Sequence, residues 1–309
     1  MDCLVTGGAG FIGSNLVDAL LDRGDGVTVL DDLSTGRREN LDAAVPRGAR
    51  LVELDIRDGA SVAEIVAEAA PEAIFHLAAQ IDVRKSVADP AFDSSINVGG
   101  TANMLEAARA AGTRRFVFVS TGGAIYGEGD GQELPLPELA PIAPMSPYGQ
   151  SKHAAEGYLA LYERLYGLSG VSLRLGNVYG PRQDPLGEAG VIAIFCGKLL
   201  DGGRPTVFGD GRQTRDYIYV GDVVAAALAA AESEATGAIN VGTGVETDVL
   251  ELAARLGELG GRDFEPEFSP PREGEVQRIS IDPARAGAEL GWKAEMGLAD
   301  GLRVTLDSI

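Results

Sequence analysis

Hydrophobic positions in the first half of the chain follow two alternating patterns. Short apolar runs alternate with longer stretches in which apolar residues recur every three or four positions. The runs predict buried strands and the longer stretches predict helices. The predicted strands are Asp2–Thr6, Val27–Leu30, Leu51–Leu54, Ala73–His76, Phe116–Val119 and Ser172–Leu175, and the predicted helices span 11–23, 58–70, 91–111 and 147–166. This alternation is typical of an α/β fold with a doubly wound parallel sheet.

The regular alternation ends near residue 176, where glycine and proline become frequent between short mixed elements. We therefore expect two units: a sheet domain over 1–175 and a smaller mixed α/β lobe over 176–309. The helix predicted at Val220–Ala231 and the strand predicted at Ala238–Val241 suggest that 221–243 packs back on the first unit. The smaller lobe should lie over the carboxyl end of the sheet, where ligands bind in such folds.

A glycine-rich turn links the first predicted strand to the first predicted helix. It contains Gly7, Gly8, Gly10 and Gly13. Such a turn directs backbone N–H groups and the positive end of the helix dipole at a pyrophosphate, as in the Rossmann fold. The next strand ends at Asp31, where that fold places a carboxylate on the adenosine ribose. Asp31 would repel a 2′-phosphate, so NAD is favoured, although Arg37 and Arg38 leave NADP open.

Charge and composition narrow the classes of function. The chain has 309 residues, a net charge of −20 and 45% hydrophobic residues, so it is a globular protein that lacks the basic surface of a nucleic-acid binder. Its apolar runs are too short to span a membrane, and the chain opens directly into a core strand, so we expect no signal peptide, no membrane partner and a cytoplasmic location. The two cysteines, Cys3 and Cys196, form no metal-ligand pattern, and we expect no metal. The acidic charge is also compatible with a high-salt host.

A tyrosine and a lysine four residues apart form the second strong motif. Ser146 and Pro147 suit the start of a helix, which puts Tyr148 and Lys152 on one face. An ammonium group beside a phenol lowers the phenol pKa, and the resulting tyrosinate can act as a base on an alcohol. The pair follows the fifth predicted strand, as a site beside a nicotinamide requires.

These motifs together resemble the extended short-chain dehydrogenase/reductases, and among them the nucleotide-sugar epimerases of the UDP-glucose 4-epimerase type. The resemblance covers essentially the whole chain. It rests on 6–13, Asp31, Asp55-Ile56, 76–80, Asn97, 120–127, Tyr148 with Lys152, 174–182, 209–216 and 272–275. The last three segments point to the sugar-nucleotide branch. The resemblance implies an NAD-dependent isomerase of carbohydrate metabolism that forms a homodimer through the helices at 91–111 and 147–166.

The resemblance also implies which residues bind the cofactor. The catalytic set would be Thr121, Tyr148 and Lys152, with Tyr148 as the base. NAD would contact Gly7, Gly10, Phe11, Ile12, Asp31, Leu33, Ser34, Thr35, Gly36, Asp55, Ile56, Leu77, Ala78, Ala79, Gln80, Ser120, Tyr148 and Lys152.

A nucleotide-sugar substrate, such as a UDP-hexose, is implied in the second lobe. Two arginines would clamp its diphosphate, which makes physical sense in so acidic a protein. The implied substrate residues are Thr121, Tyr148, Asn177, Val191, Ile192, Phe208, Arg215, Arg272 and Glu275. Ile279 stands where the family gates its sugar pocket, and its middle size leaves plain hexoses and N-acetylhexosamines both open, as uridine and thymidine are.

Several alternatives remain open at this point. The family's Ser or Thr hydroxyl is Thr121 when counted from the strand, but Gly122 occupies its place when counted back from Tyr126. The 4,6-dehydratases and UDP-glucuronate decarboxylases carry an acid in this turn, whereas this chain has Gly122-Gly123-Ala124. A non-catalytic NAD-binding regulator would often lack the tyrosine or the lysine. We therefore expect epimerisation at carbon 4 of the hexose through a 4-keto intermediate.

Overall fold

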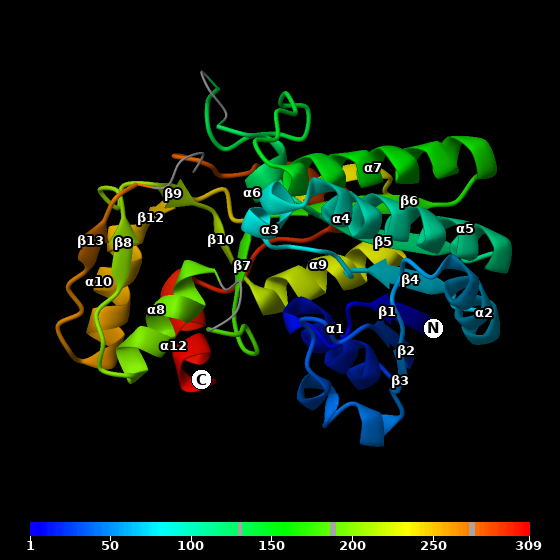
Figure 1. Cartoon of the computed structure of the whole chain (residues 1–309), viewed down its shortest axis with the longest axis horizontal. Coiled ribbons are helices and arrows are strands. Elements are labelled where there is room, and N and C mark those ends of the chain that lie inside the picture. The colour runs from blue at the N-terminus through cyan, green and yellow to red at the C-terminus, as the bar shows by residue number, and fades with distance from the viewer. Residues whose placement is uncertain (129–131, 186–189, 272–275) are drawn as a thin grey trace.

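The fold is built on a central parallel sheet, as the alternating pattern predicts (Figure 1). The computed structural model describes residues 1–128, 132–185, 190–271 and 276–309. The sheet has seven strands in the order β11-β6-β5-β4-β1-β2-β3, and every pair in it is parallel. Its strands are β1 (Asp2–Thr6), β2 (Gly26–Asp31), β3 (Arg50–Glu53), β4 (Ala73–His76), β5 (Arg115–Thr121), β6 (Gly170–Leu175) and β11 (Gly237–Val241). The expected α/β doubly wound fold class is confirmed.

Alternate residues of the strands face two separate hydrophobic layers. Val5 packs with α1 and α9 on one face, while its neighbour Leu4 packs with α2, α5 and α7 on the other. This period of two buries both faces of the sheet, which explains why the strands read as continuous apolar runs. The covering helices are α1 (Phe11–Asp22) and α9 (Val220–Glu232) on one side and α2 (Gly59–Ala69), α5 (Thr101–Ala111) and α7 (Pro147–Tyr166) on the other.

The helix predicted over 91–111 differs from the prediction, because it is interrupted. It consists of α4 (Pro90–Ser94), a π-helical turn (Ser95–Gly100) and α5. The turn carries Asn97, whose buried side chain donates to the carbonyl of Gln80 at 2.9 Å and to Ser151 Oγ at 3.0 Å. An apolar period alone cannot show that one side chain must turn inward to join a polar network.

Residues 191–219 and 247–269, with the last helix of the chain, make up most of the predicted second lobe, at the left of Figure 1. The helices at 83–88, 122–125 and 284–290 instead pack with the elements of the sheet unit. Three helices of that lobe pack around a hydrophobic cluster of their own, which includes Phe195, Leu252 and Leu302. The helices not yet named are α3 (Val83–Ala88), α6 (Gly122–Ile125), α8 (Val191–Leu200), α10 (Val249–Gly260), α11 (Ala284–Leu290) and α12 (Leu298–Asp307), and the short strand pairs are β7 (Asn177–Tyr179) with β10 (Tyr217–Tyr219), β8 (Thr206–Phe208) with β13 (Glu267–Ser269), and β9 (Thr214–Arg215) with β12 (Thr247–Asp248).

The chain returns to the sheet between two parts of the second lobe. After β10 and before β12, α9 packs on α1 and on β5, and β11 pairs with β6 as the edge strand of the sheet. None of the described helices is long and apolar enough to cross a membrane.

Candidate active site

The glycine-rich turn between β1 and α1 is too crowded for side chains. Gly7 has a φ of +68°, and a Cβ there would lie 2.8 Å from the backbone nitrogen of Ala78. A Cβ on Gly13 would strike the carbonyl oxygen of Gly7. The turn therefore holds α1 close against the ends of β1 and β4. The N-terminus of a helix in this position is where a pyrophosphate binds in such folds.

Asp31 lies beside this turn at the end of β2. Its carboxylate is buried, which raises its pKa, and it accepts hydrogen bonds from the backbone nitrogens of Leu33 at 2.9 Å and Ala9 at 2.8 Å, which oppose that rise. These bonds fix the carboxylate at the mouth of the turn. The two arginines that left NADP open are both paired with carboxylates, Arg37 with Asp184 and Arg38 with Glu53 at 2.9 Å.

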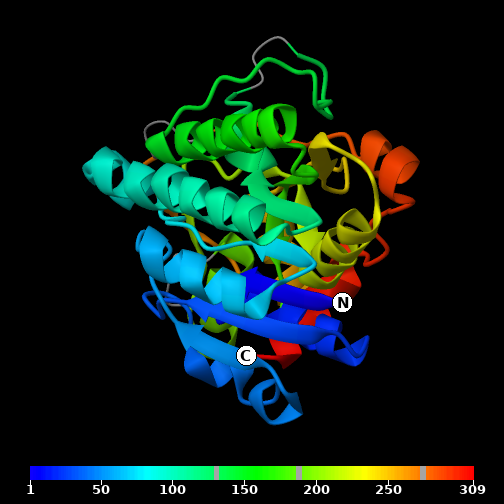
Figure 2. The same cartoon turned by 90° about the vertical axis from the view of Figure 1, so that its right-hand side faces the viewer.

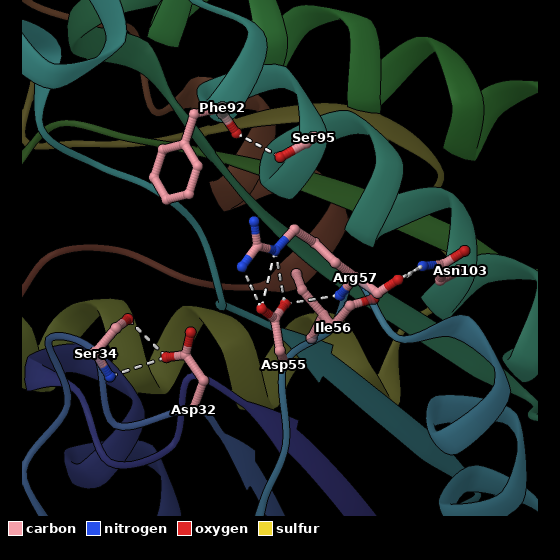
Figure 3. A network of polar contacts seen from close by, with 8 residues as sticks. All are labelled: Asp32, Ser34, Asp55, Ile56, Arg57, Phe92, Ser95 and Asn103. Atoms are coloured by element: carbon pink, nitrogen blue, oxygen red, sulfur yellow. Dashed lines mark hydrogen bonds and ion pairs between the residues drawn. The ribbon is translucent and has the colours of Figure 1, made fainter. Parts of the chain in front are cut away.

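The adenine end of the predicted cofactor site follows β3. Asp55 lies just beyond the end of that strand, and the backbone nitrogen of Leu54 donates to the carbonyl of Asp31 at 3.0 Å. Figure 3 shows the Asp55 carboxylate facing the guanidinium of Arg57, with Asp32 and Ser34 across from them. Gly7, Asp31 and Asp55 thus follow the ends of β1, β2 and β3, in the order in which they are predicted to meet pyrophosphate, ribose and base.

Residues 77–80, which follow β4, are the next part of the predicted cofactor site. The backbone nitrogens of Leu77 and Ala78 both donate to Thr6 Oγ1 at 3.1 Å, which fixes this strip against the first strand. Gln80 is anchored by Asn97, whose Oδ1 accepts the Gln80 backbone nitrogen at 2.8 Å. At the end of β5, the buried hydroxyl of Ser120 finds no hydrogen-bond partner among the described residues.

Thr121 and Tyr148 meet at the carboxyl end of β5. Thr121 is the last residue of that strand, and its side chain hydrogen-bonds the phenol of Tyr148. The helix that carries Tyr148 begins with Pro147 and is capped by Ser146, whose Oγ accepts the Gly149 nitrogen at 3.1 Å. Thr121, the residue expected when positions are counted from the strand, therefore supplies the hydroxyl beside the phenol. Gly122, the residue reached by counting back from Tyr126, does not.

The expected lowering of the Tyr148 pKa is wrong for this structure. Burial raises the pKa of Tyr148 to about 12, the hydrogen bond from Thr121 opposes the rise, and the charge of Asp93 adds to it. Lys152 Nζ instead donates to the carbonyl of Val119 at 2.8 Å and lies 4.8 Å from the ring centroid of Phe118. Burial lowers the pKa of Lys152 to about 8, against the opposing charges of Asp93 and Glu156. The spacing of four residues showed that Tyr148 and Lys152 share one face of the helix. It did not show how deeply that face is buried.

Asn177 connects this turn to the second lobe. Its backbone nitrogen donates to the carbonyl of Asp216 at 2.6 Å, and a Cβ on Gly123 would lie 3.3 Å from its side-chain oxygen. Because Gly123 has no side chain, it leaves room for Asn177 beside Thr121. A Cβ at position 123 would press on the Asn177 side chain, whereas it would meet Thr121 Oγ1 only at 4.0 Å.

A cavity of about 320 Å³ opens from Asn177 into the second lobe. Four of the predicted substrate residues line it: Asn177, Val191, Phe208 and Arg215. Ile192, in contrast, is buried in the hydrophobic cluster of the second lobe and does not line the cavity. The predicted residues Arg272 and Glu275 lie outside the described residues.

Seven of the lining residues were missed, and three of these seven carried a sequence signal. Ile194 and Phe195 follow Val191 at the spacing of one helix face, and Gln213 falls inside the 209–216 motif. Ile279, the expected gate, is fully buried with Ile125, Tyr126 and Leu136 and does not line this cavity. Within the described ranges, no group of three or more His, Cys, Asp or Glu side chains is placed to hold a metal ion.

Comparison with known proteins agrees with this site. Residues 3–242 match the model of the NAD dependent epimerase/dehydratase family. The chain is 49% identical to a UDP-glucose 4-epimerase of Mycolicibacterium smegmatis, over 99% of this chain and 98% of that one. Two crystal structures, each 46% identical, are similar throughout: a UDP-glucose 4-epimerase of Thermotoga maritima with UDP-glucose (TM-score 0.96; 100% and 98% covered) and one of Thermus thermophilus with NAD (TM-score 0.92; 99% and 98% covered). The chain therefore belongs to the NAD-dependent epimerase/dehydratase family.

Proposed function

We propose that this protein inverts the configuration at carbon 4 of a nucleotide-linked hexose of the UDP-glucose/UDP-galactose type, with NAD held through the cycle. One observation carries the proposal: the Thr121–Tyr148 hydrogen bond lies between the glycine-rich turn and the cavity that begins at Asn177. A base placed between a dinucleotide and a sugar nucleotide suits reversible oxidation of a sugar hydroxyl.

The residues present fit NAD. The turn at Gly7–Gly13 is a cradle that a Cβ would fill, Asp31 is fixed for the ribose hydroxyls, and Ser120 offers an unused hydroxyl at the end of β5. When bound, NAD supplies the acceptor that takes a hydride from carbon 4 and returns it. We assign this cofactor to 1–175 together with 221–243, and the sugar nucleotide to 176–309.

The proton chemistry falls to the pair at the end of β5. The hydrogen bond from Thr121, and the positive charge that a bound nicotinamide ring would add, favour ionisation of Tyr148 against the burial that raises its pKa. Once ionised, Tyr148 takes the proton of the hydroxyl on carbon 4 and gives it back after the sugar has turned over. Thr121 donates a hydrogen bond that favours the phenolate, and its hydroxyl can pass to the reacting oxygen of the sugar. Lys152 adds a positive charge on the same helix face and can bind the nicotinamide ribose.

The cavity supplies the grip on the nucleotide diphosphate. Arg215 lines it together with Phe208, which can pack on the nucleotide base, and Asn177 lies at its catalytic end. We assign Arg272 and Glu275 to the same substrate, on the family motif alone. A firm hold on the diphosphate and a loose hold on the sugar let the 4-keto intermediate rotate and present its other face.

The turn after Thr121 argues against two related activities. The 4,6-dehydratases and decarboxylases need an acid there, and Gly122, Gly123 and Ala124 offer none. The family relatives named above favour epimerisation in the same way. A non-catalytic regulator would have no need of the hydrogen-bonded Thr121–Tyr148 pair.

The test is interconversion of UDP-glucose and UDP-galactose by the purified protein without added NAD. The expected result is approach to the same equilibrium mixture from either sugar. Release of a 4-keto-6-deoxy sugar or of carbon dioxide would instead indicate a dehydratase or a decarboxylase. No turnover, with NAD bound, would indicate a regulator.

We also propose a homodimer formed through α5 and α7, which lie side by side on one face of the sheet (Figure 2). Residues of α7 whose spacing places them on one face remain exposed: Tyr158 by 41%, Leu161 by 36% and Leu165 by 60%. Such an apolar stripe can pair with its symmetry mate. A dimeric mass by light scattering at micromolar concentration is expected, and a monomeric mass would exclude the dimer. A cytoplasmic location stays a prediction.

A further inference from the structure

Arg57 binds the carboxylate of Asp55, at the predicted adenine end of the cofactor site (Figure 3). Its Nε donates to Asp55 Oδ1 at 3.1 Å and to Oδ2 at 2.9 Å, and its Nη2 donates to Oδ2 at 2.5 Å. The Arg57 backbone nitrogen adds a bond to Oδ1 at 2.8 Å. Both oxygens are thus engaged from one side, which fixes the rotamer of Asp55, and the Arg57 hydrogen bonds lower its pKa.

The guanidinium of Arg57 also packs against an aromatic ring. Its central carbon lies 5.3 Å from the ring centroid of Phe92 on α4, so the cation is covered by an aromatic face. Asn103 on α5 donates from Nδ2 to the carbonyls of Ile56 at 2.9 Å and Arg57 at 3.1 Å. Ile56 in turn packs so closely on Gly100 that a Cβ there would lie 2.5 Å from its Cδ1. The segment 55–57 is therefore fastened to two helices rather than left as a surface turn.

Three nearby carboxylates explain why a cation lies at this position. Asp31, Asp32 and Asp55 gather at the ends of β2 and β3, and the charge of Asp32 also acts on Arg57. A carboxylate that is free to rotate could accept either the 6-amino group of adenine or the ring N1–H of a 6-oxo purine. A carboxylate whose orientation is fixed by two hydrogen bonds from one guanidinium can accept from only one of these groups.

We propose that Arg57, covered by Phe92, is the positioning residue that aims Asp55 at the 6-amino group of the purine and so makes the site select adenine over a 6-oxo purine. The proposal rests on the assignment of Asp55 to the adenine end of the NAD site. It adds a residue that acts through another and does not touch the reacting atoms.

The experiment compares binding of NAD and of nicotinamide hypoxanthine dinucleotide by calorimetry, using nucleotide-free protein prepared identically for each variant. We expect the unmodified protein to prefer NAD by about tenfold or more, since a hydrogen bond to a charged group contributes that much. Arg57→Ala should weaken NAD binding by about tenfold and weaken the hypoxanthine dinucleotide less, so the preference falls toward one. Arg57→Lys should restore it only in part, because an ammonium cannot form the fork.

Arg50→Ala is the matched control. Arg50 forms a similar two-bond ion pair with Glu68, at 2.8 and 3.1 Å, at the start of the edge strand β3, whereas Arg57 follows the end of that strand. The control substitution should leave both affinities unchanged. Arg50→Ala should also keep the turnover of the unmodified protein, so a loss seen only in Arg57→Ala is assigned to the cofactor site and not to the loss of a surface ion pair.

Three results would overturn the proposal. Equal weakening of both dinucleotides would make Arg57 a support of the fold, and no change in either would make it a surface ion pair. If Asp55→Asn leaves the preference unchanged while NAD still binds, Asp55 does not meet the 6-amino group, and the assignment beneath the proposal fails. Failure of the proposed epimerase activity is separate, since it would appear as missing turnover with the dinucleotide preference intact.

Discussion

The hydroxyl of Thr121 hydrogen-bonds the phenol of Tyr148, although one ends a strand of the sheet and the other begins a helix that covers it. The bond fixes where a sugar hydroxyl must arrive, because the base and its donor point into the same space. Gly123 leaves that space open toward Asn177. In the proposed mechanism, this part of the chain would therefore serve both proton transfer and substrate binding.

Removing the phenol oxygen tests this arrangement most directly. Tyr148→Phe keeps the ring and loses the base, so we expect turnover to fall at least about a hundredfold. NAD should still bind, as measured by calorimetry. Thr121→Val, which keeps the shape and loses the hydroxyl, should lose less, since the phenol remains. Turnover close to that of the unmodified protein in Tyr148→Phe would contradict the role of this residue.

A substitution in the glycine-rich turn should reduce NAD affinity and not remove the catalytic base. A Cβ at Gly13 would strike the carbonyl oxygen of Gly7, so Gly13→Ala must push α1 away from the turn. We expect NAD affinity to fall by a factor of about ten or more, together with a lower thermal midpoint. The control is Gly24→Ala, where the added Cβ meets nothing within 4 Å although φ is +81°, so it should cost some stability and spare NAD affinity. Normal NAD binding by Gly13→Ala would contradict the placement of the pyrophosphate.

The grip on the substrate is tested in the second lobe. If Arg215 and Arg272 hold the diphosphate, each contributes about 2–3 kcal/mol through charge-assisted hydrogen bonds. Replacing either by alanine should raise the dissociation constant of UDP-glucose by roughly 30- to 150-fold. NAD affinity should barely change, because Arg215 lines the cavity of the second lobe and Gly7 lies at the other end of the cleft. A parallel loss of NAD binding would show that these arginines support the cofactor or the fold.

Much of this molecule could be predicted from its sequence, because local patterns determine it. The buried strands are continuous apolar runs, α7 begins where Ser146 and Pro147 predict, and Asp31 ends β2 as the distance from Gly10 requires. The resemblance placed Asn177, Val191, Phe208 and Arg215 around what is one cavity in the structure.

The features that escaped prediction depend on burial and on contacts between distant segments. The π-helical turn exists because Asn97 reaches Gln80 and Ser151, which no local pattern shows. The raised pKa of Tyr148 comes from burial, which helix spacing does not report. Ile192 has the same apolar character as Val191, yet it faces the core of the second lobe.

His76 is a second buried group whose state can be worked out. Thr6 Oγ1 accepts two backbone N–H groups, so its own proton goes to His76 Nδ1 at 2.7 Å. His76 Nε2 must then carry the ring proton and donate to Thr101 Oγ1 at 3.0 Å, and Thr101 donates onward to the carbonyl of Asn97 at 2.6 Å. Burial, with the charge of Lys152 as a smaller cause, lowers the pKa of His76 to about 3. The ring is therefore neutral wherever the protein is folded.

This neutrality predicts how acid acts on the fold. Between pH 6.5 and about 3 the unfolded chain binds a proton at His76 that the folded protein does not, so stability falls as the pH decreases through this window. The expected slope from this one group is about 1.4 kcal/mol per pH unit once the unfolded histidine is protonated. Urea unfolding at pH 7, 6, 5 and 4 measures it. His76→Gln should lower stability at pH 7 yet flatten the acid slope by about one proton. The other histidine, His153, has a side chain that is 42% exposed, and His153→Gln should keep the slope of the unmodified protein. Equal slopes in all three proteins would mean that His76 accepts a proton in the folded state and that the Thr6–His76–Thr101 chain is not fixed as described.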